Sequence, residues 1–561
     1  MTMRKTLLSL FAALAAFTAA GQPVERIYVS TDKGAYVAGD LVWCSLFCID
    51  AAGTPVLSSA SSIAYLELVS SQGTAVTGKV ALIGGRGAGV LPLPANMPTG
   101  NYALVAYTSC NRNEQGRGYL DGAKILSVFN TMTTERIPGG VEIIDNQITD
   151  TEDALSDPLG GLALQVNRRA KAGSVLPLFL RCGTDASVSV SVYRTDEIAE
   201  PAAPGIDRFL AGLPAPGSVR VTGDRIPDFD GEVIYATING KDREKALSVP
   251  HPVAIISAQG AASDTYTSDF QDGKAVFFTN NIYGDRDLVC ELGGMDEGTQ
   301  CFLHLEQPYL YPTVGGIPPL KLSETYRTAL LERHLAMQAF HAGYADTLVQ
   351  FLPVRENLLL RREDRTVYHL DDYVRFPTVD EVLVELVPEL RVRKGKRRTR
   401  EIQMLYTDKA GALSYFRDNI LVLLDGIAVT DHARLLEYDA LLFQDIEIYP
   451  HPYLFGMNVY NGIVNFSTRK GGSLSLRMND LTQVIDFKGA SYPVALTGKH
   501  VPAENDRRQT LFWHPAVTLP AGQEVRLEVR TGALPGRYRV VVEGLDGRLG
   551  AVRSEAEFEV Y

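Results

Sequence analysis

The chain has 561 residues, of which 45% are apolar and 21% are charged, and its formal net charge is −12. A chain of this length exceeds one hydrophobic core and is typical of about three to five domains. The composition is ordinary for soluble globular protein. The negative charge argues against a general nucleic-acid binder, because a phosphate backbone would repel such a surface.

Residues 1–21 have the pattern of a secretory signal peptide. Arg4 and Lys5 precede an apolar run from Leu7 to about Ala16, and small residues follow before Gln22. This run is shorter than the roughly 20 residues that a membrane anchor needs. We therefore expect an exported protein that is periplasmic or peripheral to the outer membrane.

Residues 23–132 contain short alternating strands broken by turn residues, such as "RIYVSTD" and "LVWCSLFCID". This pattern predicts an antiparallel β-sandwich. Residues 133–160 are acidic, contain Gly139-Gly140, end at the pair Gly160-Gly161 and show little strand pattern, so we expect a linker.

Apolar and polar residues alternate again in residues 161–228 and 229–310, and this pattern predicts two further β-domains. Residues 311–371 are expected to be a linker with one helix at 323–342, capped by Ser323 and ended by Gly343. Residues 372–472 mix a short helix with strands, and residues 473–561 predict a C-terminal sandwich. The expected fold class is mostly β, with serial sandwiches and one α+β domain.

The six cysteines are too few for a disulfide scaffold, although export permits disulfides. Cys290 and Cys301 flank the polar stretch "ELGGMDEGTQ" and are the best candidate pair, since they would face each other across a hairpin. Cys44 and Cys48 lie on one strand and are expected to be small core residues.

The stretch "LVLLDGIAVTDH", Leu421 to His432, places acids beside a buried run, a pattern that sometimes marks an acid/base pair. Asp-Gly between apolar strands is also the strongest short-range hairpin signal. We therefore interpret Asp425-Gly426 as a turn and expect Asp431 and His432 to be exposed.

A basic run occupies the turn between two predicted strands of the same domain. It is either a solvated hairpin tip or a contact for anions, such as lipopolysaccharide, lipid phosphates or an acidic partner loop. The basic residues are Arg391, Arg393, Lys394, Lys396, Arg397, Arg398 and Arg400.

No enzyme motif supports a catalytic, cofactor or metal site. The histidines do not form H-E-x-x-H, and the sequence has no G-x-S-x-G elbow, P-loop or dinucleotide fingerprint in its required context. We expect a protein without catalytic residues, cofactor or metal.

Two segments resemble known families. "ERIYVSTDKGAYVAGDLVWCSLFCIDAAGTP" resembles the MG2 domain of the alpha-2-macroglobulin superfamily, which implies a fibronectin-like sandwich. Residues 372–472 resemble the plug domain of TonB-dependent outer-membrane receptors. The residues that carry this second resemblance are Asp425, Gly426, Asp445, Glu447, Gly456 and Gly462. The combination resembles exported proteins of Bacteroidota.

The departures from both families matter for function. Only 89 residues follow Gly472, so we expect no receptor barrel from this chain. The string "RCGTDA" at Cys182 lacks the glutamine of a macroglobulin thioester, which argues against covalent trapping. The resemblance implies a non-enzymatic scaffold or accessory subunit that docks on an outer-membrane β-barrel complex for assembly, secretion or nutrient uptake. Alternatives are a free-standing ligand-binding module, or a protease inhibitor or enzyme with a long-range site.

Overall fold

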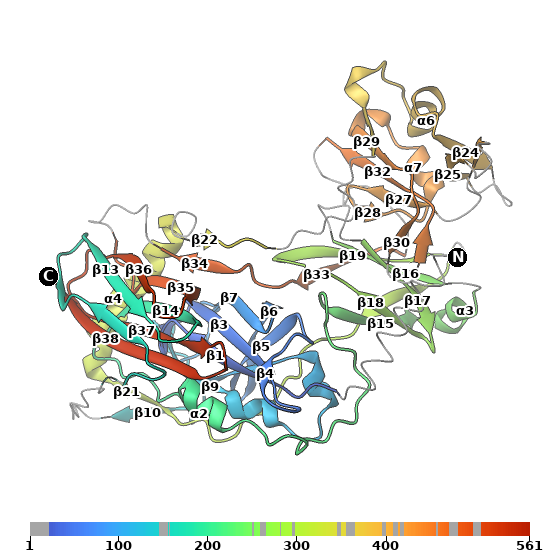
Figure 1. The fold of residues 1–561 in the computed structure, drawn as a ribbon. Coiled ribbons are helices and arrows are strands. Elements are labelled where there is room, and N and C mark those ends of the chain that lie inside the picture. Colours follow the sequence, from blue (N-terminus) through green and yellow to red (C-terminus); the bar gives the residue numbers. More distant parts are fainter. Residues whose placement is uncertain are drawn as a thin grey trace. The chain divides into compact units, whose positions relative to one another are not determined.

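The computed structural model describes residues 22–144, 155, 157–249, 252–258, 265–280, 282–293, 295, 298–344, 349–354, 365–394, 400–407, 413–415, 420–455, 458–469, 481–497 and 506–561 (Figure 1). The predicted signal peptide lies outside these residues. Within them, no helix combines the length and the apolar character that a membrane crossing requires. The chain is mostly β, with several sandwiches and one α+β unit. This is the fold class that the alternating sequence pattern predicts.

The first sandwich is formed by strands β1 to β9. Its strands hydrogen-bond in the order β1-β3-β7-β6-β5-β8-β9-β2, with β4 on β3. Apolar side chains that alternate along these strands meet in one core between the two layers. The strands are β1 (Glu25–Thr31), β2 (Ala35–Val37), β3 (Leu41–Asp50), β4 (Val56–Leu57), β5 (Ile63–Ser70), β6 (Gly73–Ile83), β7 (Arg86–Pro92), β8 (Gly100–Tyr107) and β9 (Lys124–Phe129).

The acidic segment that follows is not a linker throughout. Strand β10 (Val141–Ile144) pairs in parallel with β21 (Leu320–Ser323), far along the chain. The sequence "VEII" is too short to show alternation by itself, so its partner determines its conformation. Residues 145–154 of the predicted linker lie outside the described residues.

The predicted domains 161–228 and 473–561 are not separate, and this prediction was wrong. The two segments build one sandwich, here called the split sandwich. The larger sheet has the order β12-β38-β37-β14-β35-β34-β22, and the smaller has the order β11-β13-β36. The strands are β11 (Ala163–Val166), β12 (Arg169–Ala170), β13 (Val175–Arg181), β14 (Ala186–Arg194), β22 (Val349–Phe351), β34 (Val494–Leu496), β35 (Thr510–Leu519), β36 (Glu524–Arg530), β37 (Gly536–Asp546) and β38 (Ala551–Val560).

The third sandwich also takes a strand from beyond its predicted range. Its sheet runs β20-β15-β18-β17-β16-β19-β33, and β33 comes from the segment assigned to the C-terminal sandwich. Phe487 of β33 lies in the core that the earlier strands form. The strands are β15 (Val233–Gly240), β16 (Val253–Ala258), β17 (Thr265–Gln271), β18 (Lys274–Phe278), β19 (Asp285–Gly293), β20 (Cys301–Leu305) and β33 (Gln483–Lys488), with helix α3 (Arg243–Leu247) beside them.

The helix predicted at 323–342 is present, in three joined pieces. A 3-10 turn η3 (Glu324–Tyr326) leads into α4 (Arg327–Ala339), and a π-helical turn η4 (Phe340–Tyr344) follows. The Ser323 hydroxyl accepts a hydrogen bond from the Thr325 amide, as expected of a capping serine. A further short helix, α2 (Ile206–Ala211), lies in the segment after β14.

The α+β unit begins at Thr366, before the predicted Asp372, because β23 completes its sheet. The order is β23-β29-β32-β27-β28, and helices α6 and α7 contribute to the core on one face. The elements are β23 (Thr366–His369), η5 (Leu370–Asp372), α6 (Val379–Leu386), β24 (Leu390–Lys394), β25 (Arg400–Thr407), β26 (Leu413–Tyr415), β27 (Leu421–Leu424), β28 (Ile427–Ala428), α7 (His432–Leu436), η7 (Ala440–Leu442), β29 (Phe443–Tyr449), β30 (Tyr453–Phe455), β31 (Asn458–Tyr460) and β32 (Ile463–Thr468).

The α+β unit is joined to the third sandwich through its second face. Ile255 of β16 shares a buried cluster with Leu421 and Leu423 of β27. The Thr265 hydroxyl donates to the Gly426 carbonyl at 2.6 Å, and the Ala428 amide donates to Ser257 Oγ at 3.1 Å. Apolar packing reinforced by buried hydrogen bonds makes these two parts one body.

The chain forms two compact units. One contains Met1–Phe229, Tyr309–Val354 and Ala490–Tyr561, which hold the first and split sandwiches and α4. The other contains Asp230–Pro308 and Arg355–Gly489, which hold the third sandwich and the α+β unit. Each unit is therefore built from segments that are distant in the sequence.

Candidate docking surfaces

Asp425 and Gly426 form a tight turn between β27 and β28, as predicted. Both residues have positive φ, 49° and 81°, which suits a two-residue hairpin. The Asp425 carboxylate accepts hydrogen bonds from the amide of Thr468 at 2.7 Å and from its hydroxyl at 2.6 Å. The carboxylate thus fastens the turn to the end of β32.

The other motif residues of the α+β unit also make local structural bonds. Asp445 on β29 accepts a hydrogen bond from His369 on β23 at 2.7 Å, which raises the pKa of this exposed imidazole. Glu447 forms an ion pair with Arg365 at 3.0 Å. At Gly462 an added Cβ would lie 2.3 Å from the sulfur of Met404, so a larger residue there would require the Met404 side chain to move. Gly456 lies outside the described residues.

The described residues of the basic run lie on the antiparallel pair of strands β24 and β25. Arg391 stacks on Tyr415, with 3.8 Å from its guanidinium carbon to the ring centroid, and Arg400 forms an ion pair with Asp380. Arg393 and Lys394 are exposed, and neither forms an ion pair within the described part of the chain. Lys396, Arg397 and Arg398 lie outside the described residues.

The predicted Cys290–Cys301 disulfide is wrong, because both residues are free, buried thiols. Cys290 on β19 pairs with Ile256 and Gln483, while Cys301 on β20 pairs with Gly240. The two strands therefore do not form a hairpin with each other. Burial raises the pKa of the Cys290 thiol to about 12, which keeps it protonated and unreactive.

His432 is also placed differently from the prediction, since it is not exposed. Its Nδ1 accepts a hydrogen bond from the Ile402 amide at 3.2 Å, and burial lowers its pKa to about 4. Asp431 caps helix α7 by accepting from the Arg434 amide at 3.1 Å. Both side chains therefore hold the loop after β28 in place.

Glu291 is a buried acid that the sequence analysis missed. It lies on β19, is only 1% exposed, and accepts a hydrogen bond from the Thr482 hydroxyl at 2.7 Å. Burial raises the pKa of this carboxyl to about 7, against the lowering effect of hydrogen bonds from Thr482 and Thr430. Its signal was a lone charge inside the apolar run "LVCELG".

Glu291 should make the third sandwich less stable as pH rises. Its pKa is about 7 in the folded protein and 4.5 ordinarily, so the folded state binds the proton more tightly. Glu291 does not change the free energy of unfolding below pH 4.5. As the pH rises from 4.5 to 7, this free energy falls by roughly 3 kcal/mol in total, at 1.36 kcal/mol for each pH unit. In the Glu291→Gln variant the free energy of unfolding should no longer fall with pH. Hydrogen exchange of the β19 amides measures this pH dependence.

The exposed Glu385→Gln variant is the matched control for this measurement, and it should keep the wild-type slope. Equal slopes for Glu291→Gln and wild type would contradict the assignment.

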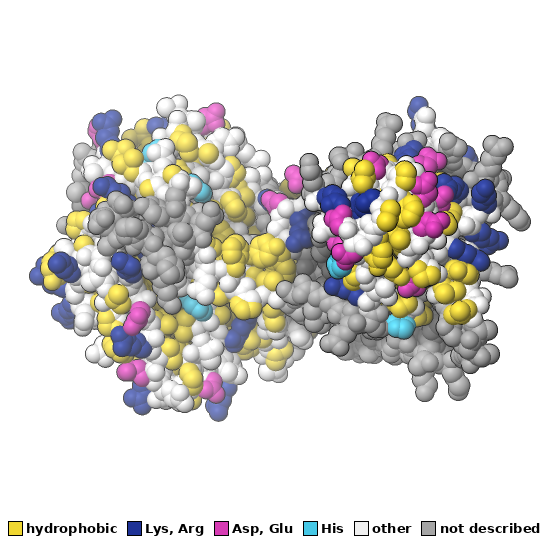
Figure 2. All heavy atoms as spheres, turned by 90° about the horizontal axis from the view of Figure 1, so that it is seen from above, with side chains coloured by type: hydrophobic (Ala, Val, Ile, Leu, Met, Phe, Trp, Pro, Cys, Tyr) yellow, Lys and Arg dark blue, Asp and Glu magenta, His cyan; other side chains and the backbone are white. Residues whose placement is uncertain are grey.

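An apolar patch lies on the α+β unit where two segments run side by side. We define the apolar patch as Tyr373, Val374, Leu441 and Leu442. Val374 is 79% exposed and Leu441 is 53% exposed. Figure 2 shows hydrophobic side chains among acidic and basic ones on one face of this unit.

Several hydrogen bonds, two of them half-buried, hold the two segments of the apolar patch together. Arg375 donates to the carbonyls of Ala440 and Phe443 at 2.7 and 2.8 Å. The Ala440 amide donates to the Pro377 carbonyl at 3.0 Å. Arg469 donates to the Leu441 carbonyl and forms an ion pair with Asp371. An apolar centre framed by charge is the usual anatomy of a protein-binding surface.

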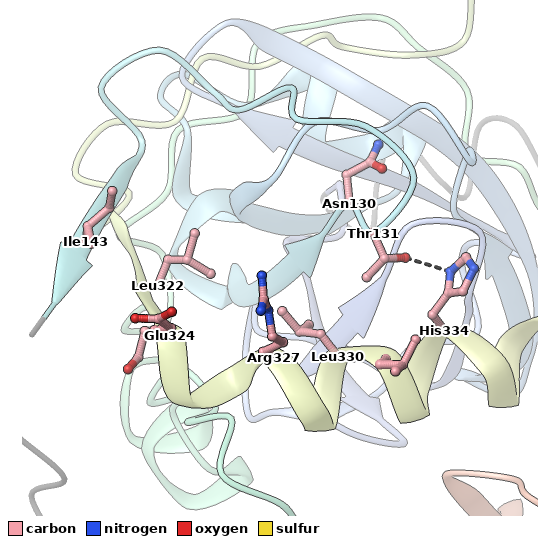
Figure 3. Close-up of a pocket in the computed structure, with 10 residues that line it drawn as sticks. Asn130, Thr131, Ile143, Leu322, Glu324, Arg327, Leu330 and His334 are labelled. Atoms are coloured by element: carbon pink, nitrogen blue, oxygen red, sulfur yellow. Dashed lines mark hydrogen bonds between the residues drawn. The ribbon is translucent and has the colours of Figure 1, made fainter. Parts of the chain in front are cut away.

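A groove of about 470 Å³ lies beside α4 in the other unit (Figure 3). Ile143 of β10 and Leu322 of β21 line one side, and Arg327, Leu330 and His334 of α4 line another. A hydrogen bond of 2.7 Å joins Thr131 Oγ1 and His334 Nδ1. The groove has no counterpart in the sequence predictions, since it is built from segments near residues 130, 143 and 330.

No known protein family model matches the chain, and no curated protein does. Solved structures give distant likenesses. Trypsin-activated alpha-2-macroglobulin of Escherichia coli is 9% identical, with a TM-score of 0.22, over 96% of this chain and 41% of that one. A Salmonella alpha-2-macroglobulin mutant is 9% identical, with a TM-score of 0.24, over 96% and 40%.

The Escherichia coli adhesin FdeC is 12% identical over 50% of this chain and 64% of that one, with a TM-score of 0.13. The chain spans about two fifths of the length of the two macroglobulins. Likeness at this level does not define a family or an activity.

Proposed function

We propose that the protein is an exported, non-catalytic scaffold that docks through its α+β unit on an outer-membrane β-barrel complex. The apolar patch carries this proposal. Contact of the exposed Val374 and Leu441 side chains with water is unfavourable in free energy. A hydrogen bond from Arg375 to the Ala440 carbonyl holds the two segments together. The resemblance of this unit to receptor plug domains suggests the class of partner.

The acids and histidine that first suggested chemistry support a scaffold, because each makes structural bonds. Asp425 fastens a turn, Asp431 caps helix α7, and His432 accepts a hydrogen bond from a backbone amide. The exposed Arg393 and Lys394 add a contact for anionic lipid or lipopolysaccharide phosphate beside the docked partner.

Charge placed in the apolar patch should prevent docking. We expect Val374→Glu and Leu441→Glu to reduce co-purification with the membrane complex at least about tenfold, since a buried unpaired charge costs more than 1.4 kcal/mol. The measurement is the amount of partner retained after gentle detergent extraction. Arg393→Glu with Lys394→Glu tests the anionic contact in the same assay.

Val175→Glu is the matched control, because Val175 is 57% exposed on β13 of the other unit. It should retain the wild-type amount of partner. A wild-type protein that never co-purifies with a membrane protein would remove the scaffold proposal and favour a free-standing binding module.

A further inference from the structure

The groove beside α4 is the open end of a hydrophobic core. Leu320, Phe129 and Tyr326 are buried together, and Leu322 and Leu330 pack against them. The same two leucines line the groove, where Ile143 is 70% exposed and Leu331 is 58% exposed. The apolar surface therefore continues outward from the core without being covered by any described residue.

Two opposite charges, Arg327 and Glu324, line this largely apolar groove, and no ion pair joins them. The Arg327 side chain is exposed and points into the groove in Figure 3. It forms no ion pair or side-chain hydrogen bond within the described part of the chain. His334 is held by Thr131, so the polar side of the groove is positioned before any ligand arrives. A ligand that fits must combine apolar groups with an anion.

Strand β10 offers backbone groups at the same place. It pairs only with β21 among the described strands. In a parallel ladder alternate residues direct their N–H and C=O groups to one neighbour. The Leu320 amide donates to the Gly140 carbonyl, so Val141 and Ile143 direct theirs to the other, open edge. An open edge beside a groove suits an extended peptide.

We propose that this groove binds an extended segment of a protein partner in which a large apolar residue and an aspartate or glutamate stand two positions apart. The segment adds to the open edge of β10. Side chains two apart in a strand lie on one face, so both enter the groove. The apolar residue contacts Ile143, Leu322 and Leu331, and the carboxylate pairs with Arg327.

Three independent features select this occupant. The apolar lining favours an apolar side chain, the unpaired guanidinium of Arg327 favours an acid, and the edge of β10 that no described strand covers favours a backbone. A lipid would satisfy the first two and leave the strand edge unused. The site lies outside the α+β unit and does not depend on the proposed docking there.

Selection from a random nonapeptide library displayed on phage tests the proposal with the full protein. We expect enrichment of peptides with an apolar residue and an acid two positions apart. A selected peptide, labelled and followed by fluorescence anisotropy, should bind at least about tenfold more weakly to Arg327→Glu and to Leu331→Asp. Both replaced residues are exposed, so both variants should fold.

Arg181→Glu is the control, because Arg181 is an exposed arginine on β13, and it should bind the peptide like wild type. Equal binding by Arg327→Glu, or selected peptides without acid enrichment, would overturn the proposal. The peptide is compared as its C-terminal amide and as its free acid, which should bind equally. Binding by the free acid alone would assign the groove to chain termini and would also overturn it.

Discussion

Removal of residues 490–561 is expected to unfold the split sandwich completely. β14 is its central strand, and it pairs with β35 on one side and β37 on the other. Both partners would be lost, and with them about half of the buried core, including Val542, which pairs with Val190 of β14. Limited proteolysis should then cut within residues 162–194, which are protected in the full chain.

The first sandwich is the internal control for this truncation, because its core comes from residues 27–137 alone. Its strands should stay resistant to protease. Cooperative unfolding of an isolated fragment 473–561 would contradict the split arrangement, since that result would mean the C-terminal strands form a domain by themselves.

Replacement of Asp32 by alanine is expected to destabilise the first unit by about 3 kcal/mol, the cost of breaking a buried ion pair from one side. Asp32 forms an ion pair with Lys33 at 3.1 Å and accepts hydrogen bonds from Tyr36 and Trp43. It also accepts from the Thr510 hydroxyl of β35 at 2.6 Å, which links the first and split sandwiches. Alanine would leave the buried Lys33 with Asp40 alone.

Urea unfolding, followed by hydrogen exchange of β1 and β35 amides, measures this loss in both sandwiches. Asp121→Ala is the matched control, because Asp121 is exposed and its loss should change stability by less than about 0.5 kcal/mol. An Asp32→Ala protein as stable as that control would show that the buried network contributes little.

Local features of the fold could be predicted from the sequence because their causes are local. Asp425-Gly426 marks a turn since both residues accept positive φ, and alternation in "VLPLFLR" marks β13 as a half-buried strand. The helix at Arg327–Ala339 follows from its capping serine and apolar spacing.

The pairing of distant strands could not be predicted in this way. Alternation shows that a segment is a strand, but the partner is chosen by the shape of the assembled core. β14 and β37 each show a plausible strand pattern, yet nothing in either sequence indicates the other. For the same reason β33 was assigned to the wrong sandwich, and Cys290 and Cys301 were expected to meet.

The candidate surfaces were missed for a related reason. Val374 and Leu441 each belong to a short apolar pair within a turn, and long-range bonds such as those of Arg375 bring the pairs together. The groove beside α4 likewise combines Ile143 with Arg327 across almost 200 positions of sequence. The basic hairpin and the turn, by contrast, are contiguous in sequence and were found.

Docking through the α+β unit is tested most directly by a photo-activated cross-linking amino acid at position 374 in living cells. Position 175, also apolar and exposed, serves as the comparison. We predict that position 374 cross-links to one outer-membrane β-barrel protein and that position 175 does not. Cross-linking to no protein at position 374, or to the same proteins from both positions, would contradict docking through the apolar patch.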